Sequence, residues 1–161
     1  MLFPPYFFVQ QPLVLDCSYS LSFSLYGTIF VVTYHPLTVD TKLSLEGINS
    51  LLNALDQFPD TRIIITGVNA DAGGHTIATH LNEFAEKNTK RVLICKSLGQ
   101  RQYLSLIKIA NAVIGNSSSG IIEAPAIGTP TVNIGARQKG RPLATSIINC
   151  NENTRSIANA I

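Results

Sequence analysis

Short runs of β-branched and aliphatic residues alternate with longer amphipathic stretches along the chain from Thr28 onward. The run Thr28 to Tyr34 (TIFVVTY) is typical of a buried strand. In the stretch that follows, Lys42 to Phe58, the residues Ile48 and Leu52 fall on one helical stripe. Strands that are apolar throughout and separated by amphipathic helices pair in parallel and are covered on both faces. The alternation therefore predicts an α/β fold, a Rossmann-like parallel sheet of five or six strands with helices on both faces.

The rest of the chain follows the same pattern. Further strands are predicted at Arg62 to Thr66, Arg91 to Cys95, Ala112 to Gly115, Thr131 to Ile134 and Ser146 to Asn149, and further helices at Gly74 to Lys87, Gln100 to Ala110 and Asn153 to Ile161. Residues 28–161 thus form the predicted domain, which we expect to be truncated because the chain stops within its last helical pattern. Residues 1–27 are interpreted as a linker or the remnant of a preceding segment.

The composition narrows the classes of protein that the chain can belong to. Its 161 residues, of which 45% are hydrophobic and 14% charged, suit one globular domain. A net charge of +2, spread along the chain, gives no indication of a nucleic-acid partner. Prolines interrupt the apolar N-terminal segment, which argues against a membrane span. A signal peptide begins with positively charged residues, and no Lys or Arg precedes Lys42.

The cysteines and histidines show no spacing that would suit a metal or a disulfide framework. Cys17, Cys95 and Cys150 lie far apart and are odd in number. They predict neither a set of disulfides nor a zinc site, and a reducing compartment follows from that interpretation. We therefore expect a cytoplasmic protein without a metal or a cofactor.

Most of the chemically informative residues lie in one segment, Ala112 to Arg141 (AVIGNSSSGIIEAPAIGTPTVNIGARQKGR). A predicted strand there leads into four small residues, Ser117 to Gly120, which we call the serine turn. A strand that delivers small residues to a helix start presents N–H groups to an anion. The turn could instead serve only as an N-cap, but a capping box with Glu123 would need Ser or Thr at Gly120. The pattern favours phosphate binding by the serine turn.

Three cations follow the predicted strand Thr131 to Ile134. Arg137, Lys139 and Arg141 are either ordinary solvated charges or residues that contact the same anion, and the position of Arg137 just after the strand favours a ligand role. Glu123 has two interpretations that the pattern leaves equally open. It is a first-turn acid favoured by the helix dipole or a carboxylate that accepts hydrogen bonds from ribose hydroxyls.

Other polar residues follow the remaining strands. A parallel sheet binds its ligands beyond the carboxyl ends of its strands, which brings His35, Asn69 and Asp71 to the predicted binding edge. His35 is either structural or a residue for phosphate contact or proton transfer. Asn69 and Asp71 are most simply explained as turn formers before a helix. Together these residues point to a phosphorylated ligand, and a nucleotide is the candidate.

The segment GNSSSGIIEAPAIGTPTVNIGARQKGR, with VTYHP, GVNADAGG and the helix that contains Gln102, resembles the hydrolysing UDP-N-acetylglucosamine 2-epimerases. The resemblance is strongest to the branch that serves the synthesis of sialic-acid-type sugars, and it runs from about Thr28 to Ile161. Members of this family have two Rossmann-like domains in the GT-B arrangement, with the UDP-sugar in the cleft between them. By this resemblance the chain is the C-terminal, UDP-binding domain.

The resemblance also implies roles for residues that match the family's motifs. Ser117 and Ser118 would hold the diphosphate and Glu123 the ribose. Arg137 would approach the phosphates, and His35 would lie near the diphosphate as a catalytic group that assists the departure of UDP. Asn69 and Gln102 would face the nucleotide.

The implied reaction converts UDP-N-acetylglucosamine to N-acetylmannosamine and UDP, through elimination to a 2-acetamidoglucal and addition of water. The carboxylates for the proton chemistry belong to an N-terminal domain that is not found in this sequence. We therefore expect the full-length parent protein to be an enzyme that assembles as a homo-oligomer, and the chain alone to be inactive. The alternatives are another GT-B sugar-nucleotide glycosyltransferase and a non-catalytic nucleotide-binding module.

Overall fold

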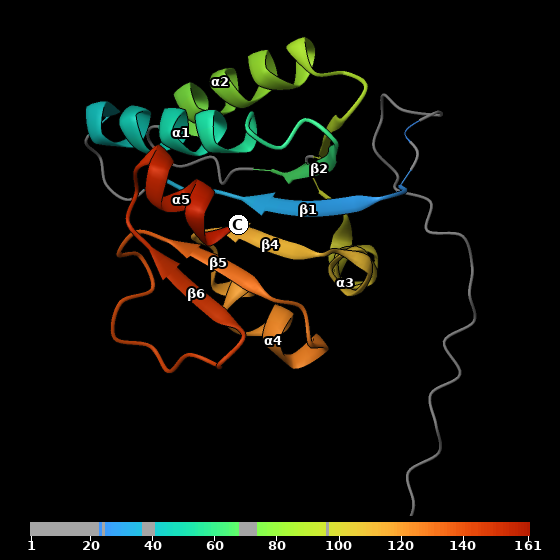
Figure 1. Cartoon of the computed structure of the whole chain (residues 1–161), viewed down its shortest axis with the longest axis vertical. Helices are drawn as coiled ribbons and strands as arrows, with labels where there is room; N and C mark the ends of the chain where they lie inside the picture. The colour runs from blue at the N-terminus through green and yellow to red at the C-terminus, as the bar shows by residue number, and fades with distance from the viewer. Residues whose placement is uncertain (1–22, 24, 37–40, 68–73, 96) are drawn as a thin grey trace, which may run out of the picture.

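Six parallel strands form one sheet in the order β3-β2-β1-β4-β5-β6. The computed structural model describes residue 23 and residues 25–36, 41–67, 74–95 and 97–161 (Figure 1). The strands are β1 (Thr28–Thr33), β2 (Thr61–Thr66), β3 (Val92–Cys95), β4 (Ala112–Gly115), β5 (Thr131–Ile134) and β6 (Ile147–Cys150). The predicted parallel α/β sheet is confirmed. The chain runs outward from β1 in one direction and then outward from β4 in the other, so the strand order reverses between these two strands.

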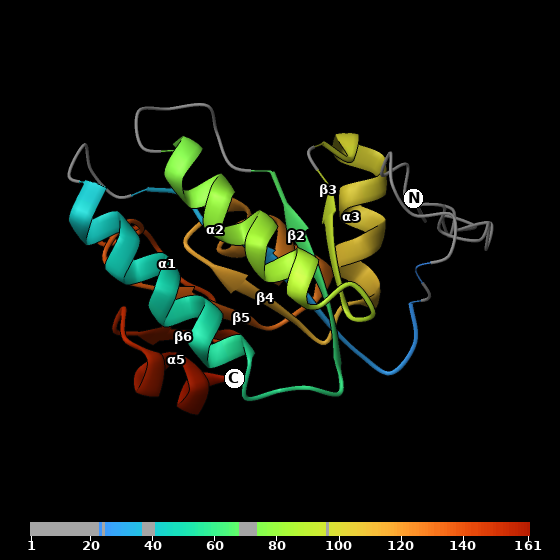
Figure 2. The ribbon, with the colours of Figure 1, turned by 90° about the horizontal axis from the view of Figure 1, so that it is seen from above.

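Helices cover both faces of this sheet. They are α1 (Thr41–Leu55), α2 (Gly74–Lys87), α3 (Gly99–Ile109), α4 (Glu123–Ile127) and α5 (Thr154–Ala160), with a 3-10 turn, η1 (Ser118–Gly120), before α4. Helices α1, α2 and α5 lie on one face, and α3 and α4 lie on the other (Figures 1 and 2). The two helical layers explain why the strand sequences are apolar throughout rather than alternating.

The central strand β1 shows how the sequence fills both layers of the core. Phe30 and Val32 pack with α1 and α2, while Ile29 and Val31 pack on the opposite face with α3 and α4. Successive side chains of a strand point to opposite faces, so a strand with helices on both sides needs apolar residues at every position. Only Thr28, at the start of β1, is exposed.

A glycine determines how closely β4 approaches β1 at the carboxyl ends of the two strands. Gly115 has a φ of +143°, and a Cβ atom at this position would lie 1.9 Å from the carbonyl oxygen of Thr33. Both the backbone conformation and the missing side chain are therefore required here. The close approach brings the serine turn directly beside the residues that follow β1.

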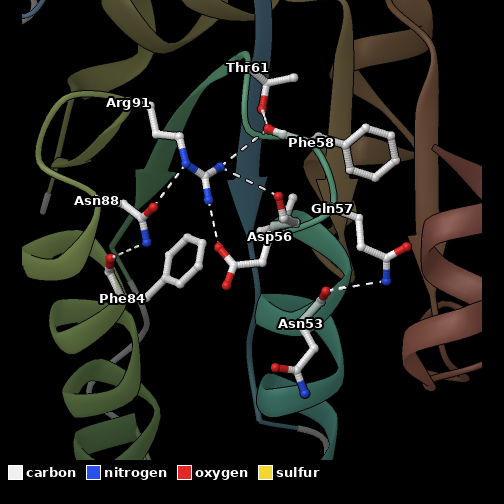
Figure 3. A network of polar contacts seen from close by, with 9 residues as sticks. Asn53, Asp56, Gln57, Phe58, Thr61, Phe84, Asn88 and Arg91 are labelled. Atoms are coloured by element: carbon white, nitrogen blue, oxygen red, sulfur yellow. Dashed lines mark hydrogen bonds and ion pairs between the residues drawn. The ribbon is translucent and has the colours of Figure 1, made fainter.

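The opposite edge of the sheet, at the amino ends of the strands, is held by Arg91 (Figure 3). Its guanidinium pairs with the Asp56 carboxylate at 2.7 Å, and its Nε donates to Oδ1 of Asn88 at 2.9 Å. A third nitrogen of Arg91 donates to the carbonyl oxygens of Leu55 and Phe58. This network joins the turn before β2 to the turn before β3, so its role is structural.

The expectation that the chain holds no disulfide was wrong for Cys95. The structure has Cys95 in a disulfide, whereas Cys150 is a free thiol. The expectation rested on spacing along the chain, which does not limit which residues the fold brings together.

Within the described ranges, no helix is both long enough and apolar enough to cross a membrane.

Candidate functional site

A pocket of about 280 Å³ lies at the carboxyl ends of the strands. It is lined by the ends of β1 and β2, the start of α3 and the serine turn. The side chains that contribute polar atoms to its walls include Thr33, His35, Thr66, Tyr103, Ser117 and Ser119. The pocket therefore lies where the strand order reverses, the position at which α/β sheets bind ligands.

The polar residues of this edge are organised around Asn116, which is fully buried between β4 and the serine turn. Its side chain makes two hydrogen bonds of 2.8 Å to the main chain of His35, accepting from the N–H and donating to the carbonyl group. The main-chain N–H of Asn116 donates to the carbonyl oxygen of Thr33 at 3.2 Å. Asn116 thus extends the pairing of β1 and β4 by one residue beyond the last strand residues.

The serine turn begins as an N-cap and continues into the pocket. The hydroxyl of Ser117 accepts a hydrogen bond from the N–H of Ser119, and the turn continues as η1. The hydroxyl of Ser119 is hydrogen bonded to the Tyr103 hydroxyl on α3 at 2.5 Å. The same turn therefore forms a cap and lines the pocket, and the phosphate binding that the sequence favours for it stays a prediction.

Glu123 begins the short helix α4, which ends at Gly128 in the left-handed conformation. Its side chain is partly buried, and its Oε2 atom has no hydrogen-bond partner among the described residues. A buried carboxylate oxygen without a partner is costly, and a ligand hydroxyl would remove that cost. The structure is therefore compatible with a ligand role for Glu123, which stays a prediction.

The cations after β5 have two different surroundings. The guanidinium of the exposed Arg137 donates to the carbonyl oxygen of Asn116 at 3.3 Å, so it points toward the serine turn. Buried Gln138 donates to the same carbonyl oxygen at 2.7 Å. Lys139 and Arg141 instead line a larger, open groove of about 930 Å³ beside β6 and α5. The structure therefore separates Arg137 from the other two cations.

A buried tyrosine connects the pocket edge to this groove. The hydroxyl of Tyr34, the residue before His35, donates to the carboxylate of Glu152, which lines the groove. Burial, with the hydrogen bond and charge of Glu152, raises the pKa of Tyr34 far above its usual value. Burial, and then the charge of Glu152, also raises the pKa of the Cys150 thiol to about 11. Tyr34 and Cys150 are therefore neutral at physiological pH.

The structure brings several of the residues expected from the sequence together and leaves others aside. His35, Ser117 and Arg137 are all connected to Asn116 or adjacent to it in sequence. Gln102 lies half-buried on α3, and the next residue in the sequence, Tyr103, lines the pocket. Asn69 lies outside the described residues.

Sequence reasoning missed Asn116, Gln138 and the threonines at the ends of β1 and β2. The hydroxyls of Thr33 and Thr66 are hydrogen bonded at 2.5 Å in the pocket wall. A polar residue just after a predicted strand was the available signal for Asn116. The threonines are common in strands, and Gln138 lies among cations, so neither offered a clear signal.

Comparison with known sequences gives one family and several relatives. The family model described as UDP-N-acetylglucosamine 2-epimerase matches residues 19–161. GDP/UDP-N,N'-diacetylbacillosamine 2-epimerase (hydrolyzing) of Campylobacter jejuni is 43% identical over 133 residues, which cover 83% of this chain and 35% of the relative. Polysialic acid biosynthesis protein P7 of Escherichia coli is 41% identical over 126 residues, 78% of this chain and 32% of the relative. The chain thus spans about a third of the length of these relatives.

Solved structures share the fold of this chain. UDP-GlcNAc 2-epimerase from Methanocaldococcus jannaschii superposes with a TM-score of 0.65 at 17% identity, over 86% of this chain and 39% of that one. UDP-GlcNAc 2-epimerase from Neisseria meningitidis, bound to UDP-GlcNAc, gives a TM-score of 0.58 at 12% identity, over 92% of this chain and 36% of the other. At such identities the likeness concerns the fold alone.

Proposed function

This chain belongs to the UDP-N-acetylglucosamine 2-epimerase family, and we propose that it is the UDP-binding, C-terminal half of a hydrolysing enzyme of the GT-B type. Two observations support this proposal. The chain covers about a third of each of these two relatives, and its described residues form one sheet where the GT-B arrangement has two domains. The activity therefore belongs to the longer parent protein, and the isolated domain binds UDP without turnover.

The proposed UDP site is the pocket at the carboxyl ends of β1, β2 and β4. The observation that carries the proposal is that His35, the serine turn and Arg137 all connect to Asn116 at this edge. Ser117 and Ser118 would hold the diphosphate with their hydroxyls and N–H groups, while Arg137 would neutralise its charge. Glu123 would accept hydrogen bonds from the ribose, and Asn69 and Gln102 would face the nucleotide.

In the proposed reaction the parent protein removes the proton at C2 of the sugar while the bond between C1 and the diphosphate oxygen breaks. This elimination gives UDP and a 2-acetamidoglucal, and addition of water then gives N-acetylmannosamine. His35 would stabilise the departing diphosphate by donating a hydrogen bond or a proton to it. The base for the C2 proton would come from the partner domain, because Glu123, which follows the serine turn, would be committed to the ribose.

Two sugars are candidates for the substrate. UDP-N-acetylglucosamine, with a role in sialic-acid-type sugar synthesis, is favoured by the 41% identity to polysialic acid biosynthesis protein P7. UDP-N,N'-diacetylbacillosamine is favoured by the 43% identity to the Campylobacter jejuni epimerase. Incubating the full-length parent with each sugar nucleotide and following UDP release and the free sugar would distinguish them. Transfer of the sugar to an acceptor would indicate a glycosyltransferase instead.

Calorimetry with the chain itself tests the binding half of the proposal. We expect UDP to bind more tightly than uridine, because the serine turn and Arg137 recognise the phosphates. Equal affinity for UDP and uridine would contradict the proposal that this pocket recognises the diphosphate. UDP binding by the parent without release of UDP from either sugar would indicate a non-catalytic module. A cytoplasmic location and a homo-oligomeric parent remain part of the proposal.

A further inference from the structure

Asn116 has a contact pattern that neither a cap nor a ligand-binding residue requires. It is 0% exposed, so its atoms do not reach a ligand in the pocket. Both polar atoms of its side chain bind the main chain of His35, at 2.8 Å each. Its carbonyl oxygen accepts hydrogen bonds from Arg137 and Gln138, and the next residue, Ser117, opens the serine turn.

We propose that Asn116 is a positioning residue that holds His35 against the serine turn, so that both groups meet one diphosphate. This proposal rests on the proposed function, because it assumes that the pocket binds UDP. The side chain of Asn116 replaces the main chain of one further strand residue, because it offers one acceptor and one donor to the main chain of its neighbour. Beyond Thr33 the two strands no longer pair through their backbones, and the amide replaces that pairing.

Asparagine is specifically suited to this position. The main chain of His35 presents one N–H and one carbonyl group, and only a primary amide supplies the matching acceptor and donor from one short side chain. Aspartate would keep the acceptor but lose the donor, and alanine would lose both. Without these bonds, the main chain of His35 would lose its two hydrogen bonds to the residue that precedes Ser117, and its position relative to Ser117 would be less well fixed. Small displacements of this kind are costly at sites that depend on exact orientation.

The chain offers a matched control in Asn111, at the opposite ends of the same two strands. The Asn111 side chain accepts a hydrogen bond from the N–H of Ile29 at 2.8 Å, and its own N–H donates to the carbonyl oxygen of Ile29 at 2.8 Å. The Asn111 side chain therefore ties β4 to β1 by one hydrogen bond, whereas the Asn116 side chain makes two to the residue that follows β1. Asn111 lies at the amino edge, far from the pocket, so its loss reports on the fold alone.

The test compares Asn116→Ala and Asn111→Ala in the chain by thermal unfolding and by calorimetry with UDP and with uridine. Both variants are expected to unfold at lower temperature than the unaltered chain. Asn116→Ala should lose roughly tenfold in UDP affinity while uridine affinity changes less than about twofold. Asn111→Ala should leave both affinities within about twofold. If Asn116→Ala does not fold, Asn116→Ser, which keeps a small polar group there, takes its place.

A double-mutant cycle separates positioning from a general structural role. If Asn116 acts through His35, then Asn116→Ala should have almost no further effect on UDP affinity in a His35→Ala background. The same loss in both backgrounds, equal losses for UDP and uridine, or an unchanged UDP affinity would each overturn the proposal. Failure of the unaltered chain to bind UDP would overturn the proposed function as well. UDP binding that is insensitive to Asn116 would overturn only the positioning role.

Discussion

The two edges of the sheet are both rich in polar contacts, but they use their polar groups differently. At the amino edge, every nitrogen of the Arg91 guanidinium has a partner within the protein, including the Asp56 carboxylate (Figure 3). At the carboxyl edge, Arg137 contacts a single carbonyl oxygen, and Glu123 and Gln138 each have a buried oxygen without a partner among the described residues. The completeness of the hydrogen bonding, rather than the number of polar residues, thus distinguishes the structural network at the amino edge from the proposed binding site at the carboxyl edge.

The charges lead to the same distinction. Arg91 is largely buried, and its charge is balanced by Asp56 at 2.7 Å. Arg137 is exposed and makes no ion pair with a carboxylate in the described part of the chain. A buried cation needs its partner for stability, whereas an exposed cation beside a pocket retains its charge for a ligand. Substitutions at the two edges should therefore separate stability from binding.

Gly115→Ala should produce the largest effect, because it disturbs the approach of β4 to β1 that supports the whole carboxyl edge. The added Cβ would lie 1.9 Å from the Thr33 carbonyl oxygen, at a φ that alanine rarely adopts. We expect a loss of about 4 kcal/mol or more in the free energy of unfolding. Chemical denaturation followed by circular dichroism measures it. As a control, Gly140→Ala adds a Cβ that would have no neighbouring atom within 4 Å, and its cost should be limited to backbone strain of about 1 kcal/mol. Equal losses would show that the approach to Thr33 is not tight.

Arg91→Met should lower stability without affecting the pocket. The substitution removes the ion pair with Asp56 and leaves the carbonyl groups of Leu55 and Phe58 without this donor. We expect a loss of about 2–3 kcal/mol in the free energy of unfolding, with UDP affinity within about twofold of the unaltered chain. Denaturation and calorimetry on the same sample measure both quantities. A large loss of UDP affinity in a folded variant would contradict the separation of the two edges.

Arg137→Ala should lower the affinity for UDP and leave the stability of the fold almost unchanged. Because Arg137 is exposed and its guanidinium makes one long hydrogen bond, its loss should change the free energy of unfolding by no more than about 0.5 kcal/mol. UDP affinity should fall roughly 10- to 100-fold, since a charge-assisted contact to the diphosphate is lost. Lys139→Ala removes the same charge from the same loop on the side of the groove, and it should weaken UDP binding much less. Equal effects of the two variants would indicate a general attraction by charge rather than a contact.

The smallest effect should be a pH dependence of stability at the carboxyl edge. Cys150 has a pKa of about 11 in the folded protein, against a usual value near 9. In this range the unfolded chain loses the thiol proton first, so the folded state loses stability as the pH rises from about 9 to about 11. Urea denaturation at several pH values, for the chain and for Cys150→Ala, would measure this dependence. The free energy of unfolding of Cys150→Ala should fall less steeply with pH. If it falls as steeply as that of the unaltered chain, the pH dependence belongs to other groups such as Tyr34.

Much of the fold could be predicted because its information is local. The strands Ala112–Gly115 and Thr131–Ile134 and the helix Gly74–Lys87 have the predicted boundaries, and the other elements differ by only a few residues. Apolar runs and helical periodicity are properties of neighbouring residues, and hydrophobic burial acts on them directly. The serine turn, which the sequence predicted to bind phosphate, contributes Ser117 and Ser119 to the pocket wall, and phosphate binding itself stays a prediction.

The sequence by itself determined the alternation of strands and helices, the edge at which polar residues gather, and the family. Only the tertiary structure decided which of those residues work together. Asn116 meets His35 across 81 positions of the chain, and Arg137 turns to Asn116 while Lys139, two residues later, faces a separate groove. Arg91 likewise finds Asp56 across 35 positions. Such contacts depend on how closely two strands or turns approach, and that distance is set by the packing of the whole core rather than by any local pattern.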